Sequence, residues 1–195
     1  AVRFASRPES PGMGEGRLKP AGAVTFTLLY LYAGRPRRAD IGTCLAALTA
    51  EFNACQNFEF NIAWSLVEVD MLAVGSTKDL LKASVRAKHL QDLRSGRYDA
   101  FVAAPPANTF LRERHSSSSS LPPLRDHQHP RGLPGLAAFL QEKVRRENKW
   151  IDLTLEALKV ALGAGVLSLL EFPEQWGSLA QGCPASIWDD PRMEA

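Results

Sequence analysis

Residues 98–110 read YDAFVAAPPANTF, an apolar run that stops at two consecutive prolines. The part from Ala100 to Ala104 has no polar alternation, which is typical of a parallel strand that helices cover on both faces. Pro105 and Pro106 cannot donate a backbone N–H, so they must lie beyond the last ladder bond of this strand. Because ligands of open α/β sheets bind outside the carboxyl ends of strands, we expect a functional turn over residues 104–110. A proline turn that simply closes a strand is the alternative.

Strands and helices alternate on either side of this run. Apolar, β-branched segments predict buried strands over residues 24–34, 62–71 and 166–170. Periodic apolar residues predict helices over about 41–54 with Asp40 as N-cap, over a segment from Leu81 that ends at Gly96, and over 139–162. The order predicts an α/β fold: a doubly wound, mostly parallel, Rossmann-like sheet with helices on both faces. The carboxyl ends of its strands should lie side by side.

Composition bounds the class of protein. The chain has 195 residues, enough for one domain. Its net charge of +2 is only a weak indication of a nucleic-acid partner. Its three cysteines lack the CxxC spacing of a zinc site, so we expect no metal and reduced thiols in an intracellular protein, nuclear or cytoplasmic. No apolar run approaches the roughly 20 residues that a membrane helix needs.

The domain organisation follows from local composition. Residues 1–22 mix Arg, Pro, Gly and Ser and predict a disordered leader, residues 23–178 the domain, and residues 179–195 a C-terminal tail. Within the domain, residues 111–135 hold five consecutive serines and three of the four histidines, which predicts a long mobile loop. The first residue is Ala1 rather than methionine, which suggests a processed chain or part of a longer polypeptide.

The strand ends resemble a known family in their order. The segments in question are LYLYAG (29–34), VEVDM (67–71), STKDLL (76–81), AAPPANTF (103–110) and LLEFPE (169–174). Together they are similar to the motifs of class I S-adenosylmethionine-dependent methyltransferases, and specifically of the cytosine-5 DNA methyltransferase-like group. The resemblance covers about residues 26–176 and implies that fold, truncated here, with S-adenosylmethionine as cofactor and DNA or RNA as partner.

The resemblance also implies roles for single residues. Ala33 and Gly34 would lie against the methionine part of the cofactor, Asp70 would hold the ribose hydroxyls and Asp79 the adenine amino group. Helix capping by Asp79, and a solvated Asp70, are the structural alternatives. The catalytic positions would be Pro105, Pro106, Asn108 and Glu171, of which Glu171 would contact the ring of a flipped cytosine.

One departure from the family concerns the reacting group. The family's nucleophile is the cysteine after the proline, and here Ala107 stands at that place. A methyl side chain cannot add to a pyrimidine, so we expect a catalytically silent domain that still binds cofactor. Amino methylation lacks its polar and aromatic residues at Ala104 and Ala107, and oxygens of Asn108 or Thr109, or the thiol of Cys183, are weak substitutes.

Nucleic-acid contacts would come from the turn and the following loop. Phe110 could stack a base, and the arginines of the loop could contact phosphates: Arg112, Arg114, Arg125 and Arg131. Solubility is the alternative for the arginines, and a solvated loop is the expectation for the loop histidines. The competing function is a non-catalytic α/β binding or interaction module; a third, weaker one is another nucleotide-dependent Rossmann-type enzyme, for which we find no phosphate-binding glycine loop.

Overall fold

The computed structural model of the chain describes residues 22–34, 38–55, 60–70, 79–175, 177–179 and 182–193. Within these residues one sheet holds four parallel strands in the order β2-β1-β3-β4. The strands are β1 (Ala23–Leu31), β2 (Asn61–Val69), β3 (Ala100–Ala103) and β4 (Leu167–Leu170). The helices between them are α1 (Ile41–Ala54), α2 (Ala83–Arg94) and α3 (Ala138–Gly163), and short 3-10 turns are η1 (Arg112–His115), η2 (Ile187–Asp189) and η3 (Pro191–Met193).

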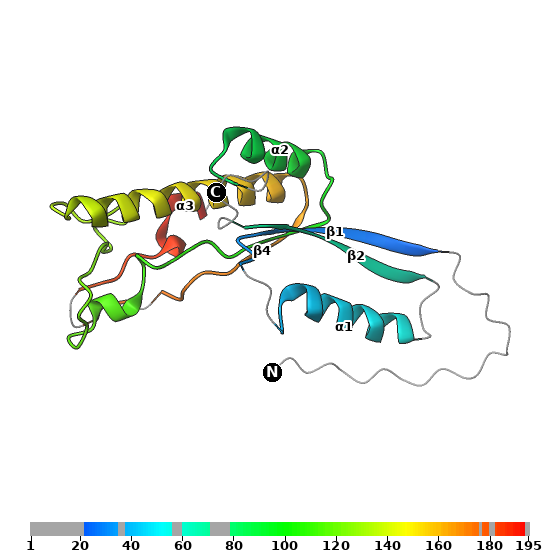
Figure 1. Ribbon diagram of the computed structural model, residues 1–195, viewed down its shortest axis with the longest axis horizontal. Coiled ribbons are helices and arrows are strands. Elements are labelled where there is room, and N and C mark those ends of the chain that lie inside the picture. The colour runs from blue at the N-terminus through cyan, green and yellow to red at the C-terminus, as the bar shows by residue number, and fades with distance from the viewer. Residues whose placement is uncertain are drawn as a thin grey trace.

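The sheet is wound in two directions from β1. The chain moves outward to β2 on one side, then returns past β1 to β3 and on to β4. Right-handed crossovers place the connecting helices of opposite directions on opposite faces. Figure 1 shows this arrangement, with α1 on one face of the sheet and α2 and α3 on the other. The α/β prediction with a truncated, parallel Rossmann-like sheet is therefore confirmed.

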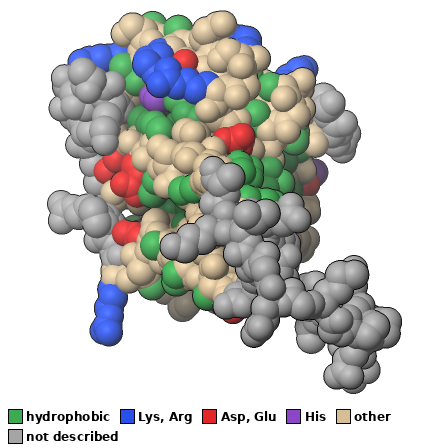
Figure 2. All heavy atoms as spheres, turned by 90° about the vertical axis from the view of Figure 1, so that its right-hand side faces the viewer, with side chains coloured by type: hydrophobic (Ala, Val, Ile, Leu, Met, Phe, Trp, Pro, Cys, Tyr) green, Lys and Arg blue, Asp and Glu red, His purple; other side chains and the backbone are tan. Residues whose placement is uncertain are grey.

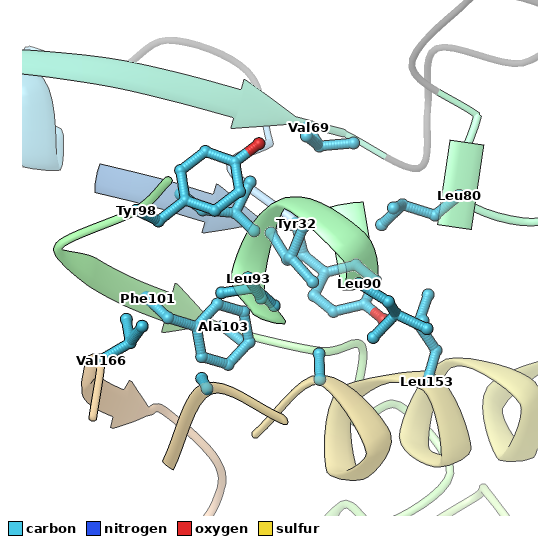
Figure 3. Close-up of a cluster of buried hydrophobic side chains, with 14 residues drawn as sticks. Tyr32, Val69, Leu80, Leu90, Leu93, Tyr98, Phe101, Ala103, Leu153 and Val166 are labelled. Carbon is cyan, nitrogen blue, oxygen red and sulfur yellow. The ribbon is translucent and has the colours of Figure 1, made fainter. Parts of the chain in front are cut away.

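The main core lies between the sheet and the layer of α2 and α3. Leu29 and Phe101 have no exposed surface, and they contribute from neighbouring strands to one buried cluster. Figure 3 shows side chains of α2 and α3 converging on this strand pair. Full burial of one such side chain stabilises the fold by roughly 1.5–3 kcal/mol, so this layer holds the strand ends in place.

Helix α1 packs less tightly against the sheet than α2 and α3, which both have buried side chains. Asp40 caps it as expected, since its Oδ1 accepts a hydrogen bond from the Thr43 amide at 2.8 Å. None of the residues of α1 is buried, and Leu48 remains 62% exposed. Figure 2 shows hydrophobic side chains at the surface on the face that lies at the right of Figure 1, below basic side chains at the top.

Strand β4 differs from its prediction as a buried strand. It stands at the edge of the sheet, where Leu167 is 73% and Leu169 60% exposed. These two side chains share a face with Ala100 and Val102 of β3, according to the strand register. The prediction was wrong because an unbroken apolar run does not reveal whether a further helix covers that face.

Candidate functional site at the carboxyl edge of the sheet

The ends of the four strands meet at one edge, as predicted. The Tyr32 amide donates to the carbonyl of Val69 at 2.8 Å, and the Ala104 amide donates to Leu31 at 3.3 Å. The Glu171 amide donates to the carbonyl of Ala103 at 2.9 Å. These bonds extend the hydrogen bonding of the sheet by one residue beyond the strands. Asp70, Ala104 and Glu171 are the first residues after β2, β3 and β4.

The edge contains the topological switch point of the sheet. Strand β1 lies between β2 and β3. The connection from β1 leads to β2 on one side, and the connection from β2 leads back to β3 on the other side of β1. A crevice between such strands is the usual ligand position in open α/β sheets. Ala33 and Gly34 follow β1 at this point and are partly exposed, and Gly34 has a left-handed φ of 72°. Among the described residues, no atom lies within 4 Å of a Cβ added at Gly34, so they leave the backbone there open to a ligand.

Tyr32, the residue after β1, is buried in the core and has a strained backbone conformation. Its φ of 65° is unusual for a residue with a side chain, and such outliers gather at functional sites. The Tyr32 hydroxyl donates to the carbonyl of Trp150 at 3.1 Å and accepts from Thr154 Oγ1 at 3.1 Å. Burial raises the pKa of Tyr32 strongly, so the phenol stays neutral. Figure 3 shows the ring held between Leu90 and Leu153.

The two predicted cofactor carboxylates lie on either side of a gap in the described chain. Asp70 follows β2 directly and is half-buried, next to the turn after β1. Asp79 is half-buried, and its Oδ1 accepts from the Leu81 amide at 3.0 Å. Asp79 therefore serves the turn before α2; it does not cap the helix, whose N-cap is Lys82, so the capping alternative is wrong in this respect. Residues 35–37 and 71–78 lie outside the described residues.

The proline turn has the form that its sequence predicted. The Ala104 amide makes the last ladder bond, and Pro105 follows it as a buried residue. Ala107 then accepts a hydrogen bond from the Phe110 amide at 2.9 Å, which closes the turn. Asn108 and Glu171 are exposed, so their side chains are available at this edge.

Thr109 belongs to a buried polar network that we did not predict from the sequence. Its amide and its hydroxyl both donate to Glu147 Oε2, at 2.9 and 2.5 Å. The same hydroxyl accepts from Arg125 Nε at 2.6 Å. Thr109, Arg125 and Glu147 are at most 2% exposed. A signal was present, because the spacing from Val144 to Ile151 places the charged Glu147 on the buried stripe of α3.

Arg125 is the centre of this network. Its guanidinium also donates to the carbonyls of Pro130 at 2.6 Å and Val144 at 3.2 Å, and to Asn148 Oδ1 at 2.6 Å. Burial lowers the pKa of Arg125 to about 10, although the nearby Glu147 carboxylate opposes the shift. The side chain remains charged at neutral pH, and its charge is compensated inside the protein.

Phe110 is packed within the protein. Its ring is 7% exposed and meets Phe172 edge to face, with 5.1 Å between ring centroids. The Arg125 guanidinium lies 4.1 Å from the centroid of the Phe110 ring, over its face. A base could stack on Phe110 only after these neighbours moved, so its prediction as a base-stacking residue finds no support in this geometry.

The four arginines of the loop fall into two groups. Arg114 and Arg125 are buried, and Arg114 donates to the carbonyls of Asn108 and Pro122, each at 3.0 Å. Arg112 and Arg131 are exposed, although Arg131 forms a bidentate ion pair with Asp152 at 2.6 and 2.8 Å. Only Arg112 and Arg131 could therefore reach a phosphate in this structure.

The expectation that the loop histidines are solvated is wrong for His115 and confirmed for the other two. His115 and Leu124 are buried together with the two internal arginines. His127 and His129 are exposed, and His129 Nδ1 lies 2.9 Å from Asp126 Oδ1. The serine run gave no apolar periodicity, so the hydrogen bonds that order the loop could not be read from the pattern.

Comparisons with known proteins do not identify a family. No family model matches this chain, and no curated protein matches it. Among the described residues, no group of three or more His, Cys, Asp or Glu side chains is placed to hold a metal ion. No described helix combines the length and apolarity required to cross a membrane.

Proposed function

We propose that this chain is a methyltransferase-like domain that binds S-adenosylmethionine at the carboxyl edge of its sheet and does not transfer the methyl group. The observation that carries the proposal is the open backbone at Gly34, placed at the switch point between β1 and β3. A glycine with φ of 72° and free space around it permits close approach of a ligand to the backbone.

The neighbouring groups suit a nucleoside. Asp70 leaves β2 beside the turn that carries Gly34, where a carboxylate can accept hydrogen bonds from ribose hydroxyls. Packing in the core holds the strained Tyr32 in place, so the backbone at the end of β1 is rigid. Rigid, strained backbone at a strand end is a device of binding sites.

The loss of catalysis is supported by what surrounds Ala107. Its methyl group packs against the buried cluster around Phe110 and Ile187 and has no nucleophilic atom. The nearest hydroxyl in sequence, that of Thr109, is engaged with Glu147 and Arg125. Cys183 lies against the loop, where its carbonyl accepts from the His127 amide at 3.0 Å.

Cofactor binding is tested by calorimetric titration with S-adenosylmethionine up to about 1 mM, a concentration that detects even weak binding. We expect heat of binding, and a loss of at least about tenfold in affinity for Asp70→Asn, since charge-assisted hydrogen bonds contribute about 1.5–3 kcal/mol. The control is Glu156→Gln, an exposed carboxylate on the part of α3 that leads back to the opposite edge of the sheet. Absence of heat for the unmodified chain would reject the proposal.

Methyl transfer is tested separately with labelled cofactor and duplex DNA or RNA. We expect no incorporation above background, because removal of a catalytic nucleophile costs on the order of a million-fold in rate. Incorporation that disappears in Asp70→Asn would show an active enzyme and contradict the silent-domain proposal while supporting the cofactor site.

The nucleic-acid partner is a further part of the proposal, and it rests on fewer residues than the sequence indicated. Arg112 is exposed beside the proline turn, and Arg131 is exposed within its ion pair. Binding through phosphates should weaken steeply as salt is added. We expect low-salt fluorescence anisotropy with duplex DNA to show weak binding that Arg112→Ala reduces, while Arg145→Ala, an exposed arginine on α3, serves as the control.

A non-catalytic interaction module is the second candidate, and the uncovered face of β4 favours it. Leu167 and Leu169 project there from an edge strand, an arrangement that sheets generally cover or charge. Failure of the cofactor titration, together with self-association or partner binding lost in Leu169→Lys, would favour this module over the methyltransferase-like domain.

A further inference from the structure

A cavity of about 120 Å³ lies away from the strand-end crevice, between three segments that are distant in sequence. The loop contributes Arg125, His127, Pro130 and Arg131, α3 contributes Asn148 and Ile151, and the C-terminal segment contributes Ala185, Ser186, Ile187, Asp189, Asp190 and Pro191. Figure 1 shows this C-terminal segment beside the first half of α3. Neither Gly34 nor Asp70 lines the cavity, so it is a separate site.

The floor of the cavity is apolar and firmly packed. Phe110, Ile151 and Ile187 belong to one buried cluster, and each is at most 7% exposed. An apolar cavity of about 150 Å³ accommodates a benzene molecule. This cavity is somewhat smaller but open to solvent beside the exposed Asp189, so it can hold most of one six-membered ring with its substituent at the opening. The buried Arg125 guanidinium over Phe110 keeps that floor fixed.

The charged side chains in the cavity wall differ in whether an oppositely charged side chain lies within hydrogen-bond distance of them. Arg131 pairs with Asp152 at 2.6 Å, and Asp190 pairs with Arg192 at 2.7 Å. Asp189 instead accepts from the neutral Gln175 amide at 2.6 Å, and its Oδ2 lies 3.9 Å from His127 Nδ1. Asp189 is therefore a wall carboxylate whose neighbours leave acceptor capacity.

We propose that this cavity binds one planar ring carrying a cationic N–H donor group, an arylamidinium. The ring lies against Ile151 and Ile187 in the apolar floor, and the donor group points to Asp189. The Ser186 hydroxyl, 7% exposed in the same wall, accepts from the Trp188 amide, and its second lone pair can accept from the ligand's N–H group. An anionic ring of the same size would meet Asp189 and Asp190 and bind more weakly.

The probe for this site is benzamidinium, compared with benzoate and benzyl alcohol as ligands of similar size. Ligand-detected NMR with the full chain should give a dissociation constant on the order of 1 mM for benzamidinium, as expected for a compact ligand in a small cavity. Benzoate should bind at least about tenfold more weakly, and Asp189→Asn should weaken benzamidinium to a similar degree.

Two further variants distinguish the site from general attraction of a cation. Asp126→Asn removes a nearby loop carboxylate outside the cavity wall and should leave benzamidinium binding unchanged. Ile187→Phe fills the cavity and should abolish binding, provided that circular dichroism shows a folded chain. Equal binding of benzoate, no binding at about 10 mM benzamidinium, or undiminished binding by Asp189→Asn would overturn the proposal. Asp70→Asn should not affect this probe, so the result is independent of the cofactor site.

Discussion

The Nε–H of Arg125 donates to the Thr109 hydroxyl at 2.6 Å. That hydroxyl also donates to Glu147, so one threonine joins two buried charged groups that come from the loop and from α3. The bridge attaches the proline turn to both elements. It explains how a segment rich in serine and proline can be ordered next to the strand ends.

Removing Arg125 should therefore destabilise the whole domain. We expect Arg125→Met to lower the free energy of unfolding by about 3–5 kcal/mol, because Glu147 would remain buried without its compensating charge. Urea unfolding followed by circular dichroism measures this change. The control is Arg131→Met, whose exposed ion pair with Asp152 is worth about 1 kcal/mol or less. Similar losses for the two variants would contradict a special role for Arg125.

The ion pairs of Asp152 should stabilise the protein only above acidic pH. Hydrogen bonding from Arg131, and then from Arg192, holds the pKa of Asp152 below its ordinary 3.8. The folded state thus favours the carboxylate, and its contribution is present above pH 3.8 and is lost as the pH falls through the lowered pKa.

Asp152→Asn should consequently cost about 1 kcal/mol or less at pH 7, since the pair is solvent-screened. The difference from the unmodified chain should shrink as the pH falls below 3.8 through the lowered pKa. Urea titrations of both chains at neutral pH and at a pH below the lowered pKa measure it. An undiminished difference at the lower pH would show that Asp152 acts through packing and not through charge.

Two glycines offer a matched test of backbone strain. Gly34 has a left-handed φ of 72°, whereas Gly163 ends α3 without a positive φ, and a Cβ at either position would meet no atom within 4 Å. We expect Gly34→Ala to cost about 1–2 kcal/mol and Gly163→Ala to stabilise by about 0.5 kcal/mol. Thermal unfolding measures both. Equal effects would exclude the left-handed conformation of Gly34 as their cause.

Two leucines on opposite faces of the sheet, Leu29 and Leu169, should differ greatly in their contribution to stability. Leu29 is fully buried in β1, so Leu29→Ala should cost about 2–5 kcal/mol. Leu169 of β4 is 60% exposed, and Leu169→Ala should change stability by about 0.5 kcal/mol or less. Urea midpoints decide between these outcomes. A large loss at Leu169 would mean that another surface covers β4 in solution.

Much of the scaffold could be predicted because local patterns carry it. The apolar run before Pro105 and Pro106 marked a strand end, and Asp40 marked the start of α1. The side-by-side placement of the strand ends followed from the alternation of strands and helices, since parallel strands share one carboxyl edge.

Burial and pairing between distant residues could not be predicted in this way. Leu167 and Leu29 both stand in apolar runs of the sequence, yet Leu167 is exposed and Leu29 is buried. The exposure of Leu167 depends on which elements cover the edge strand β4, and the local sequence does not show this. Phe110 and Arg125 looked like surface contacts for a base and a phosphate, but they stack on each other inside the protein.

The sequence by itself determined the order of strands and helices, the parallel sheet and the absence of a nucleophilic side chain at position 107, since these depend on near neighbours and on residue chemistry. Only the tertiary structure decided that Thr109, Arg125 and Glu147 form one buried network, and that Asp189 faces a ring-sized cavity. The reason is that desolvation and hydrogen-bond geometry arise from residues far apart along the chain, whose meeting is set by packing.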